Sequence, residues 1–446
     1  MRRFESEFAL TFLNKFKLPI AMASRPSEQY FALVRPNACF FLRTAAKKWR
    51  IRSTEGDSML TSAENEMLTR VSAGQPAGEL LRRYWLPVGV ACELSAENPT
   101  QPVRILGETL VLFRDKRGRV GLLDDRCSHR GASLCYGRVE ERGIACAYHG
   151  WLYDTKGNCL ETPAEPPASK FHLTVKHQSY PVQKLAGLYW AYLGPEPAPL
   201  IPNFDIWFRK DGRRKIFIQP QLDCNWFQAM ENSMDPAHLE ILHQITAEPG
   251  RPIENTTRGL TDDVSSFDFY EVPYGLMKRR IYKSGMVDEH PVIFPNILRQ
   301  GNSAQIRVPI DDTHTKIYFV RFFPAEDGTV AENDEVPVEY LRHYKNPPDA
   351  LHPYAKFRMD LVQAQDHMAW ETQGPIADRT RERLTSSDRG VVMLRQVMMR
   401  EIQKLQEGRD PMGVIRDPRQ NATMLDTFLT ETIRQFAHIG DSAINQ

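Results

Sequence analysis

Residues 127–151 read CSHRGASLCYGRVEERGIACAYHGW and contain two cysteine–histidine pairs. One residue separates Cys127 from His129, sixteen residues follow, and two residues separate Cys146 from His149. Thiolates and imidazoles are the ligands that proteins use for zinc and for iron–sulfur chemistry. The stretch therefore predicts a metal site with four protein ligands.

The pattern resembles the ligand set of a Rieske [2Fe–2S] cluster. In such a cluster Cys127 and Cys146 would bind one iron and His129 and His149 the other, which raises the reduction potential above that of an all-cysteine cluster. A zinc site is the alternative, but zinc motifs usually separate the members of both pairs by two to four residues. The single residue between Cys127 and His129 favours the cluster, and with it a function in electron transfer.

A second motif lies in residues 225–243, which read NWFQAMENSMDPAHLEILH. It resembles the Asp-x2-His-x4-His motif of Rieske ring-hydroxylating oxygenases. The resemblance implies that His238 and His243 bind a mononuclear non-haem Fe(II) and that a distant carboxylate completes the site. It also implies that Asp235 connects metal-bound His238 to a Rieske histidine of a neighbouring subunit. A 2-His-1-carboxylate site leaves metal positions open for oxygen and substrate.

The spacing of this motif predicts an interrupted helix. Five residues of straight α-helix would place His238 and His243 about 140° apart, so the helix must bulge or break for both to reach one metal. Asp235-Pro236 is a good helix start and poor mid-helix sequence. We expect one helix to end near Asn232–Met234 and another to begin at Pro236. A plain helix cap is the alternative role of Asp235.

The third iron ligand is expected in residues 365–379, which read QDHMAWETQGPIADR. This segment resembles the phthalate-dioxygenase-type subfamily, whose ligand aspartate falls at Asp366. Asp360 and Glu371 are alternative ligands, and Asp366 could also be a solvated acid on a helix face. The resemblance extends from Met59 to Gly408. It is to the terminal oxygenase (alpha) subunit of phthalate-dioxygenase-like and phenoxybenzoate-dioxygenase-like systems.

Composition sets further limits. A chain of 446 residues is long enough for two or three domains. A net charge of +1 provides no basic surface for nucleic acid, and no run of eighteen apolar residues predicts a membrane span. Seven cysteines, an odd number without a disulfide pattern, suit a reducing compartment, so we expect a cytoplasmic enzyme whose spare cysteines are inert core residues.

The expected fold class is α+β in two domains. Residues 1–58 are basic. We expect them to be a disordered extension or the result of a start codon assigned too far upstream. Turn chemistry near residues 107–108, 115–118 and 154–158 predicts an all-β Rieske domain over residues 59–195. A proline-rich linker, residues 196–203, follows.

Strands over 266–272, 304–310 and 316–323, and a helix from 386–388 to Gly408, predict an antiparallel sheet with helices in residues 204–430. The resemblance implies that this catalytic domain has the helix-grip (START-like) architecture. Residues 431–446 are expected to be a C-terminal tail.

The resemblance also implies partners and a reaction. An NADH-dependent flavin/iron–sulfur reductase would supply electrons, and O2 would be used to hydroxylate, cis-dihydroxylate or O-dealkylate a small aromatic substrate, as in aromatic hydrocarbon catabolism. A head-to-tail homotrimer or a hexamer is expected. The alternatives are a Rieske electron-transfer protein without its own oxygenase chemistry and a ligand-binding module without chemistry.

Two questions stay open at the level of sequence. A substrate carboxylate would need a cationic anchor, for which the catalytic domain offers Arg279, Arg280, Arg299, Arg307 and Arg321. Each of these arginines is more simply a surface charge. Glu231 suits support of the metal site and a solvated position equally well.

Overall fold

The computed structural model describes residues 59–246, 254–255, 263–325, 335–342, 344–346 and 356–427. The expected N-terminal extension, residues 1–58, and the expected C-terminal tail lie outside these residues. The described residues belong to one structural unit, Gly56–Gln446. Within the described ranges, no helix combines the length and the apolar character that crossing a membrane requires.

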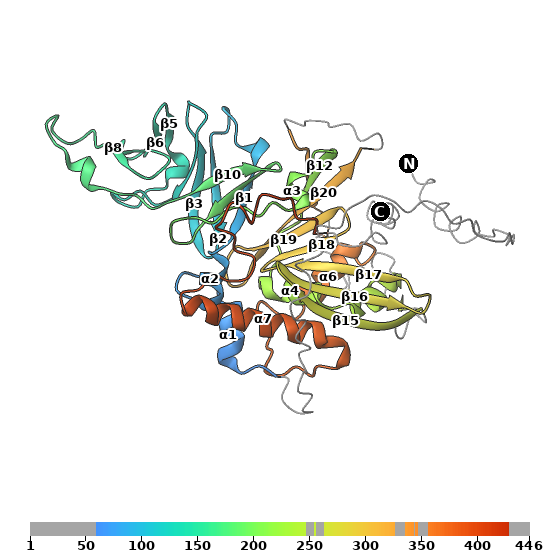
Figure 1. Cartoon of the computed structure of the whole chain (residues 1–446). Coiled ribbons are helices and arrows are strands. Elements are labelled where there is room, and N and C mark those ends of the chain that lie inside the picture. The colour runs from blue at the N-terminus through green and yellow to red at the C-terminus, as the bar shows by residue number, and fades with distance from the viewer. Residues whose placement is uncertain are drawn as a thin grey trace. The chain divides into compact units, whose positions relative to one another are not determined.

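Three small sheets form the N-terminal β domain (Figure 1). Its first sheet has the order β1 (Trp85–Val90), β11 (Leu188–Tyr192), β10 (Val182–Leu185). The second has the order β2 (Thr100–Ile105), β3 (Glu108–Arg114), β4 (Val120–Asp124), β9 (Ser179–Tyr180). The third has the order β5 (Arg138–Glu140), β6 (Gly143–Ala145), β7 (Leu152–Tyr153), β8 (Cys159–Glu161). Short 3₁₀ turns connect them: η1 (Ala91–Glu93), η2 (Leu134–Tyr136) and η3 (Phe171–Thr174).

The turns of this domain follow from local chemistry. The β2–β3 hairpin turns at Leu106 and Gly107, both at positive φ, one residue earlier than predicted. The predicted turns after β3 and β7 are confirmed. In each, an aspartate side chain accepts a backbone N–H two residues on: Arg117 N donates to Asp115 Oδ1 at 3.0 Å and Lys156 N to Asp154 Oδ1 at 2.9 Å.

Two helices precede β1. Helix α1 (Ser62–Thr69) begins at a capping box, in which Thr61 accepts the Glu64 N–H and the Glu64 carboxylate accepts the Thr61 N–H. Helix α2 (Pro76–Leu81) follows, and both helices pack against the long C-terminal helix α7 (Arg389–Gln406). The start of the Rieske domain at residue 59 stays a prediction, because residues 62–81 pack against the second domain.

The second domain is built on a curved eight-stranded sheet (Figure 1). Its order is β15 (Val264–Val272), β16 (Gly275–Tyr282), β17 (Val287–Ile293), β18 (Ile297–Gln300), β19 (Ser303–Pro309), β20 (Thr315–Pro324), β12 (Gly212–Ile218), β21 (Val338–Tyr340). All pairs are antiparallel except β12 and β21, which are parallel. A two-stranded ribbon is formed by β13 (Ile245–Thr246) and β14 (Glu254–Asn255).

Helices complete the α+β domain. They are α3 (Asp205–Phe208), α4 (Trp226–Ser233), α5 (Ala237–Ile241), η4 (Leu242–Gln244), α6 (Val362–Glu371), η6 (Ser386–Asp388) and α7. Helix α4 packs on β18 and β19, and α7 packs on β15 and α4. As predicted, α7 follows a turn at Ser386–Asp388, buries Leu394 and Met398, and is followed by Gly408 at φ +76°.

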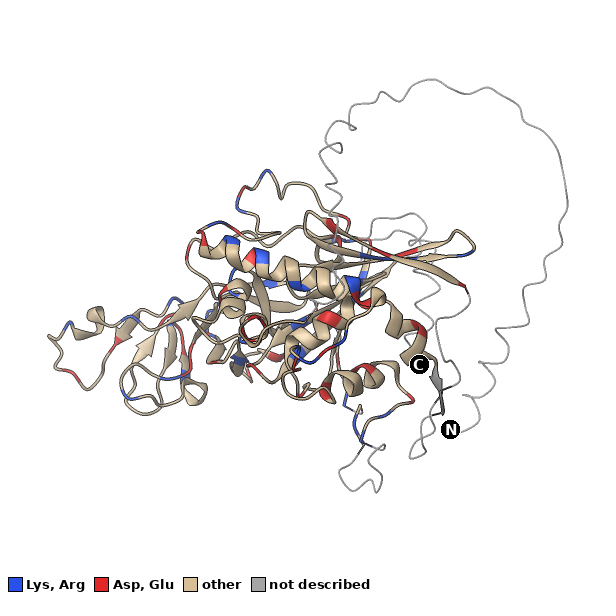
Figure 2. Ribbon diagram, turned by 90° about the horizontal axis from the view of Figure 1, so that it is seen from below, with Lys and Arg blue, Asp and Glu red and all other residues tan. Residues whose placement is uncertain are grey.

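The proline-rich segment between the domains is anchored. Leu200 pairs with Ile415, and the Trp85 indole donates to the Pro199 carbonyl at 2.8 Å. The proposed linker 196–203 therefore contacts both β1 and the segment that follows α7. Figure 2 shows lysine and arginine interspersed with aspartate and glutamate along the ribbon, which agrees with a net charge of +1.

Candidate metal centres

The two cysteine–histidine pairs lie on two similar loops of the small β domain. The first loop, between β4 and η2, carries Cys127 and the second, between β6 and β7, carries Cys146. In each loop a glycine four residues after the cysteine donates its N–H to the cysteine carbonyl, at 2.8 Å from Gly131 and 2.9 Å from Gly150. Both glycines have φ near +75°, which lets each loop turn back on itself.

These loops bring the four predicted cluster ligands together. Cys127 and Cys146 are each 3% exposed, whereas His129 is exposed and the His149 ring lies 4.5 Å from it, centroid to centroid. Burial raises the pKa of the Cys127 thiol, and the neighbouring Cys146 adds to this effect. The two buried thiols need a nearby cation to ionise, and the two imidazoles lie closer to the surface. This arrangement fits a cluster with one sheltered and one exposed iron.

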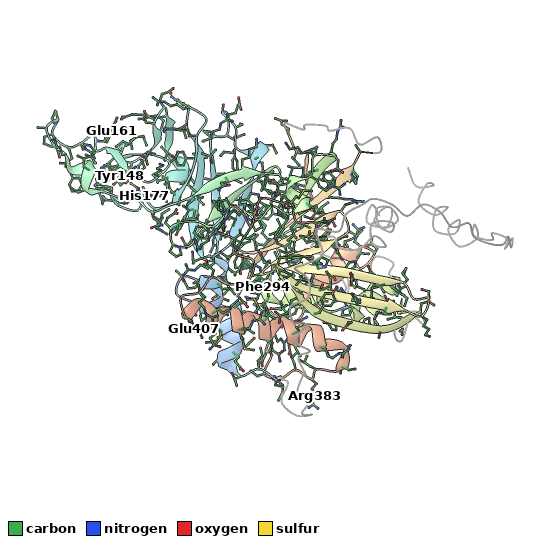
Figure 3. The ribbon with its side chains drawn as sticks, in the orientation of Figure 1. Tyr148, Glu161, His177, Phe294, Arg383 and Glu407 are labelled. Atoms are coloured by element: carbon green, nitrogen blue, oxygen red, sulfur yellow. The ribbon has the colours of Figure 1, made fainter. Side chains whose placement is uncertain are left out.

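A hydrogen-bonded group supports the first loop. The Tyr153 hydroxyl lies 3.2 Å from Cys127 Sγ, and its ring stacks on His177 at 4.5 Å. His177 Nε2 donates to the Asp124 carbonyl at 2.8 Å, so its Nδ1 accepts from the Ser128 hydroxyl at 2.7 Å. Burial lowers the pKa of His177, which keeps this ring neutral. Figure 3 shows His177 and Tyr148 in the small β domain. The sequence motif indicated neither Tyr153 nor His177.

The second predicted site is assembled from two helical regions. His238 comes from α5, His243 from η4 and Asp366 from α6. One Asp366 oxygen lies 3.8 Å from His238 Nε2 and 3.5 Å from His243 Nε2. The ligand atoms of all three residues lie within 4.8 Å of one another. A neutral imidazole pair and one carboxylate at this spacing can hold a divalent cation from one side.

The predicted helix break between the histidines is confirmed. Helix α4 ends at Ser233, α5 spans Ala237–Ile241, and the chain then tightens into a 3₁₀ turn that carries His243. Asp235 both caps α5 and approaches His238: its Oδ1 accepts the Ala237 N–H at 2.8 Å, and its Oδ2 lies 3.5 Å from His238 Nδ1. His238 Nδ1 is buried without a hydrogen-bond partner, so Asp235 is its nearest acceptor among the described residues.

His243 has an outer partner that the sequence motif did not indicate. Gln365 Nε2 donates to the Met359 carbonyl at 2.7 Å, which turns the amide oxygen toward His243 Nδ1 at 3.0 Å. An oxygen acceptor at this position requires the proton on Nδ1, so the lone pair on Nε2 points toward Asp366. Gln365 directly precedes Asp366, and this adjacency was the only available signal.

The alternative ligands have other partners. Asp360 accepts from Arg358 at 2.9 Å, and Glu371 pairs with Lys345 at 2.7 Å. Neither belongs to the group of three ligand atoms. The structure therefore brings Asp366, rather than Asp360 or Glu371, to the two histidines.

Buried polar contacts hold α4 against the segment after α6. The Gln228 amide donates to the Trp370 and Gly374 carbonyls, at 2.8 and 3.1 Å, and accepts the Ala377 N–H at 3.0 Å. These bonds fix the two parts of the chain that supply the histidines and the aspartate. The Gln-Gly-Pro-Ile-Ala-Asp-Arg segment therefore has a structural role and supplies no metal ligand.

Glu231 is a buried ion-pair residue and not a solvated acid. It accepts from Arg379 at 2.8 and 2.6 Å and from Arg395 at 2.6 Å. Arg379 Nη1 also donates to Asn65 of α1 at 2.9 Å. The network thereby connects α4 with α1, α7 and the segment after α6.

The prediction that the spare cysteines are core residues is correct for Cys159 and Cys224, which are buried. It is wrong for Cys92, which is exposed because the short η1 turn faces solvent, and Cys135 is only partly buried. Cys39 lies outside the described residues.

Comparisons with known proteins match the regions that contain both sites. A family model for the Rieske [2Fe-2S] domain matches residues 84–181, and one described as LigXa C-terminal domain like matches residues 357–432. The chain is 38% identical to the 5,5'-dehydrodivanillate O-demethylase oxygenase subunit of Sphingobium sp. (strain NBRC 103272 / SYK-6), over 81% of this chain and 85% of that protein.

It is also 35% identical to the phthalate 4,5-dioxygenase oxygenase subunit of Pseudomonas putida, over 80% of this chain and 89% of that protein. Among solved structures, a variant oxygenase of carbazole 1,9a-dioxygenase in complex with ferredoxin has the same fold. Its TM-score is 0.51 and its identity 17%, over 82% of this chain and 99% of that one.

The fold and the two sites define an oxygenase with a Rieske cluster and a mononuclear iron. The chain belongs to the Rieske non-haem iron oxygenases, as an oxygenase (alpha) subunit of the phthalate-dioxygenase type. Its cofactors are a [2Fe–2S] cluster and mononuclear iron. The reading as an electron carrier without oxygenase chemistry is not supported, since the matched relatives are oxygenase subunits over most of their length.

Proposed function

We propose that this chain oxygenates a small aromatic substrate, carboxylated or an aryl ether, at an iron held by His238, His243 and Asp366. We assign the [2Fe–2S] cluster to Cys127, His129, Cys146 and His149. The observation that carries the proposal is the convergence of the three ligand atoms within 4.8 Å from separate helices. When bound, the cluster supplies single electrons and the iron activates O2 for substrate oxidation.

The surrounding residues determine how the side chains of the proposed ligands are oriented. Gln365 holds His243 with its Nε2 lone pair toward Asp366, and Gln228 keeps α4 and α6 at a fixed separation. Asp235 accepts from His238 Nδ1 once that nitrogen is protonated, which directs His238 Nε2 toward the same point. These side chains orient the ligands before any metal binds.

Two relatives support the substrate class. One is named for O-demethylation of 5,5'-dehydrodivanillate and the other for 4,5-dioxygenation of phthalate. Both substrates are aromatic, and together the names include O-dealkylation and dihydroxylation. We propose one of these two reactions for this chain.

We further propose an NADH-dependent flavin/iron–sulfur reductase as the electron donor and a homotrimer or hexamer as the assembly. The oxygenase of carbazole 1,9a-dioxygenase, which has the same fold, was solved with ferredoxin. Among the described residues, the ring contacts of His129 and His149 all lie within the small β domain. Their exposed edges are therefore available to another chain, and we propose that Asp235 of a neighbouring subunit meets them.

A cytoplasmic location is proposed on the state of the cysteines. No disulfide joins the six cysteines within the described ranges, which suits a reducing compartment. Fractionation of the source cells with a periplasmic and a cytoplasmic marker enzyme checks this location.

The experiment that tests the function is turnover under ¹⁸O2 with NADH and a reductase, against aromatic acids and aryl ethers. Two labelled oxygens in one product establish a dioxygenase. One labelled oxygen, or loss of an alkyl group from an aryl ether, establishes a monooxygenase. His238→Ala is expected to abolish product while the visible spectrum of the cluster remains. Unchanged turnover in this variant would show that the iron site is assigned wrongly.

A further inference from the structure

One buried cation beside the mononuclear iron site lacks an acidic partner. Arg307 on β19 is 1% exposed, and within the described ranges no carboxylate forms an ion pair with it. Its neighbours are neutral: it donates to Ser233 Oγ, lies 3.3 Å from Gln305 Oε1 and lies 3.9 Å from Met230 Sδ. An unpaired buried charge costs several kcal/mol, roughly, unless another group compensates it.

The other arginines considered as anchors differ in this respect. Arg279 pairs with Glu289, Arg280 with Glu240 and Asp288, and Arg299 with Asp205. Arg321 packs on the Phe323 ring at 5.0 Å and has a further interaction within the described residues. Among these five arginines, Arg307 is therefore the one whose charge the described residues leave uncompensated.

Part of the hydrogen-bonding capacity of Arg307 is also unused. Arg307 Nε is buried without a partner, and so is the indole Nε1 of Trp370, whose ring lies 5.5 Å from the guanidinium carbon. Ser233 already donates its hydroxyl to the Ala229 carbonyl at 3.1 Å, so it can accept from Arg307 but adds no negative charge. Two buried donors without acceptors indicate that an acceptor-rich group is missing.

The place of Arg307 relates it to the iron ligands. Trp370 lies one helical turn after Asp366 on α6, and Ser233 ends α4 just before Asp235. The Asp366 carboxylate raises the pKa of Arg307 against a larger lowering by burial, and the net pKa of about 10 leaves the guanidinium charged at neutral pH. Asp366 itself points to His238 and His243, so it does not serve as the counter-ion of Arg307 when the site holds its metal.

A second unpaired cation lies on the same face of the sheet. Leu276 pairs with Val292, Val292 with Leu298 and Leu298 with Gln305, and directly paired residues point to one face. Lys278 lies two residues after Leu276 and Arg307 two after Gln305, so both point to that face. Lys278 is 2% exposed, and its ammonium group has no hydrogen bond or ion pair to another described residue. Burial lowers its pKa to about 8. Arg280 and, less strongly, Arg307 lower the pKa further, whereas Asp235 and Asp288 raise it.

From these two cations on one face of the sheet we infer that Arg307, assisted by Lys278, binds a carboxylate group of the substrate and so selects anionic aromatic compounds. The inference rests on the proposed function and names the residues that determine its specificity. Arginine offers a planar pair of donors that matches a carboxylate, and Lys278 adds a point charge. An aromatic acid anchored there would be held beside α4 and α6, the helices next to the iron ligands.

The test is binding, read from tryptophan fluorescence with the holoenzyme, anaerobic and without NADH. The probes are 4-methoxybenzoate and its neutral analogue 4-methoxybenzamide. We expect the wild type to bind the acid at least about tenfold more tightly than the amide. Arg307→Gln removes the charge but leaves a polar side chain, and it is expected to abolish this preference. Arg307→Lys is expected to restore part of it.

Arg279→Gln is the matched control, since Arg279 points to the opposite face and pairs with Glu289. This variant is expected to keep the wild-type preference. Lys278→Gln provides a second variant, expected to reduce the preference, if Arg307→Gln does not fold. Equal binding of acid and amide by the wild type, or an undiminished preference in Arg307→Gln or Lys278→Gln, would overturn the inference. Because binding is read without turnover, failed oxygenation in the ¹⁸O2 experiment would leave this result standing.

Discussion

At the scale of single residues, the two histidines proposed to bind iron have different outer acceptors. His238 has a carboxylate, Asp235, and His243 has an amide, Gln365. An amide oxygen fixes the proton on Nδ1 of His243 without adding a charge to the site. Outer partners of this kind orient a ligand and increase its basicity, so their loss weakens metal binding.

We therefore predict that Gln365→Leu lowers affinity for Fe(II) by about 10- to 100-fold, because His243 loses its acceptor. Competition with a chelator measures the affinity, and the visible spectrum of the Rieske cluster is expected to stay unchanged. Gln363→Leu makes the same replacement on α6 at a partly buried position without a side-chain hydrogen bond to the described residues. Equal affinity in the two variants would remove the role of Gln365.

Sequence indicated the proposed ligands better than the residues that support them. Cysteine and histidine at short spacings signal metal chemistry, and the aspartate lies in a motif, so Cys127, His238 and Asp366 could be proposed from the sequence. Tyr153 and Arg307 could not. Their roles depend on which side chains face them across the fold, and neither residue type is specific to metal sites.

At the scale of elements, the ion pairs of Glu231 hold α4 in place. Burial alone would raise the pKa of Glu231, but Arg379 and Arg395 outweigh burial and hold this pKa below its usual value. A carboxyl with a lowered pKa stabilises the folded chain above its usual pKa of about 4.3, and this contribution is lost as the pH falls through the lowered value.

Glu231→Gln is predicted to lower the free energy of unfolding at pH 7 by about 3–5 kcal/mol, because Arg379 would remain buried without a counter-charge and Arg395 would keep only Glu382. The difference from wild type is expected to shrink as the pH falls below about 4. Urea unfolding at several pH values measures it. Glu140→Gln, at the exposed pair with Arg138, is the control and is expected to have little effect. A pH-independent difference would contradict this origin.

Elements themselves were largely predictable. Alternating runs gave β15, β19 and β20, and the Asp-Pro pair gave the break before α5, because these signals are local. The parallel pairing of β12 with β21 could not be foreseen, nor could the packing of α1 and α2 on α7. Both depend on contacts between residues far apart in the chain.

At the scale of the whole molecule, the exposed imidazoles and Asp235 belong to one proposed contact between subunits. This contact can be tested in a mixed oligomer that contains two variant chains. One variant lacks the cluster and the other lacks the mononuclear iron. His149→Ala removes a cluster ligand and His238→Ala removes an iron ligand, so each variant alone is expected to be inactive. In a head-to-tail ring, about a quarter of the interfaces in an equal mixture would combine an intact cluster with an intact iron site.

We predict that co-expression of His149→Ala and His238→Ala restores up to about a quarter of wild-type turnover. Asp235→Asn is expected to abolish this rescue when it is placed on the His149→Ala chain, which supplies the iron site. Placed on the His238→Ala chain, it is expected to have no effect. Asparagine can still cap α5, so the asymmetry reports the carboxylate and not the fold. NADH-coupled product formation by purified mixed oligomers measures it. Absence of rescue, in oligomers shown by two affinity tags to contain both chains, would mean that each subunit works alone. Equal loss in both arrangements would instead leave Asp235 as a purely local support of His238.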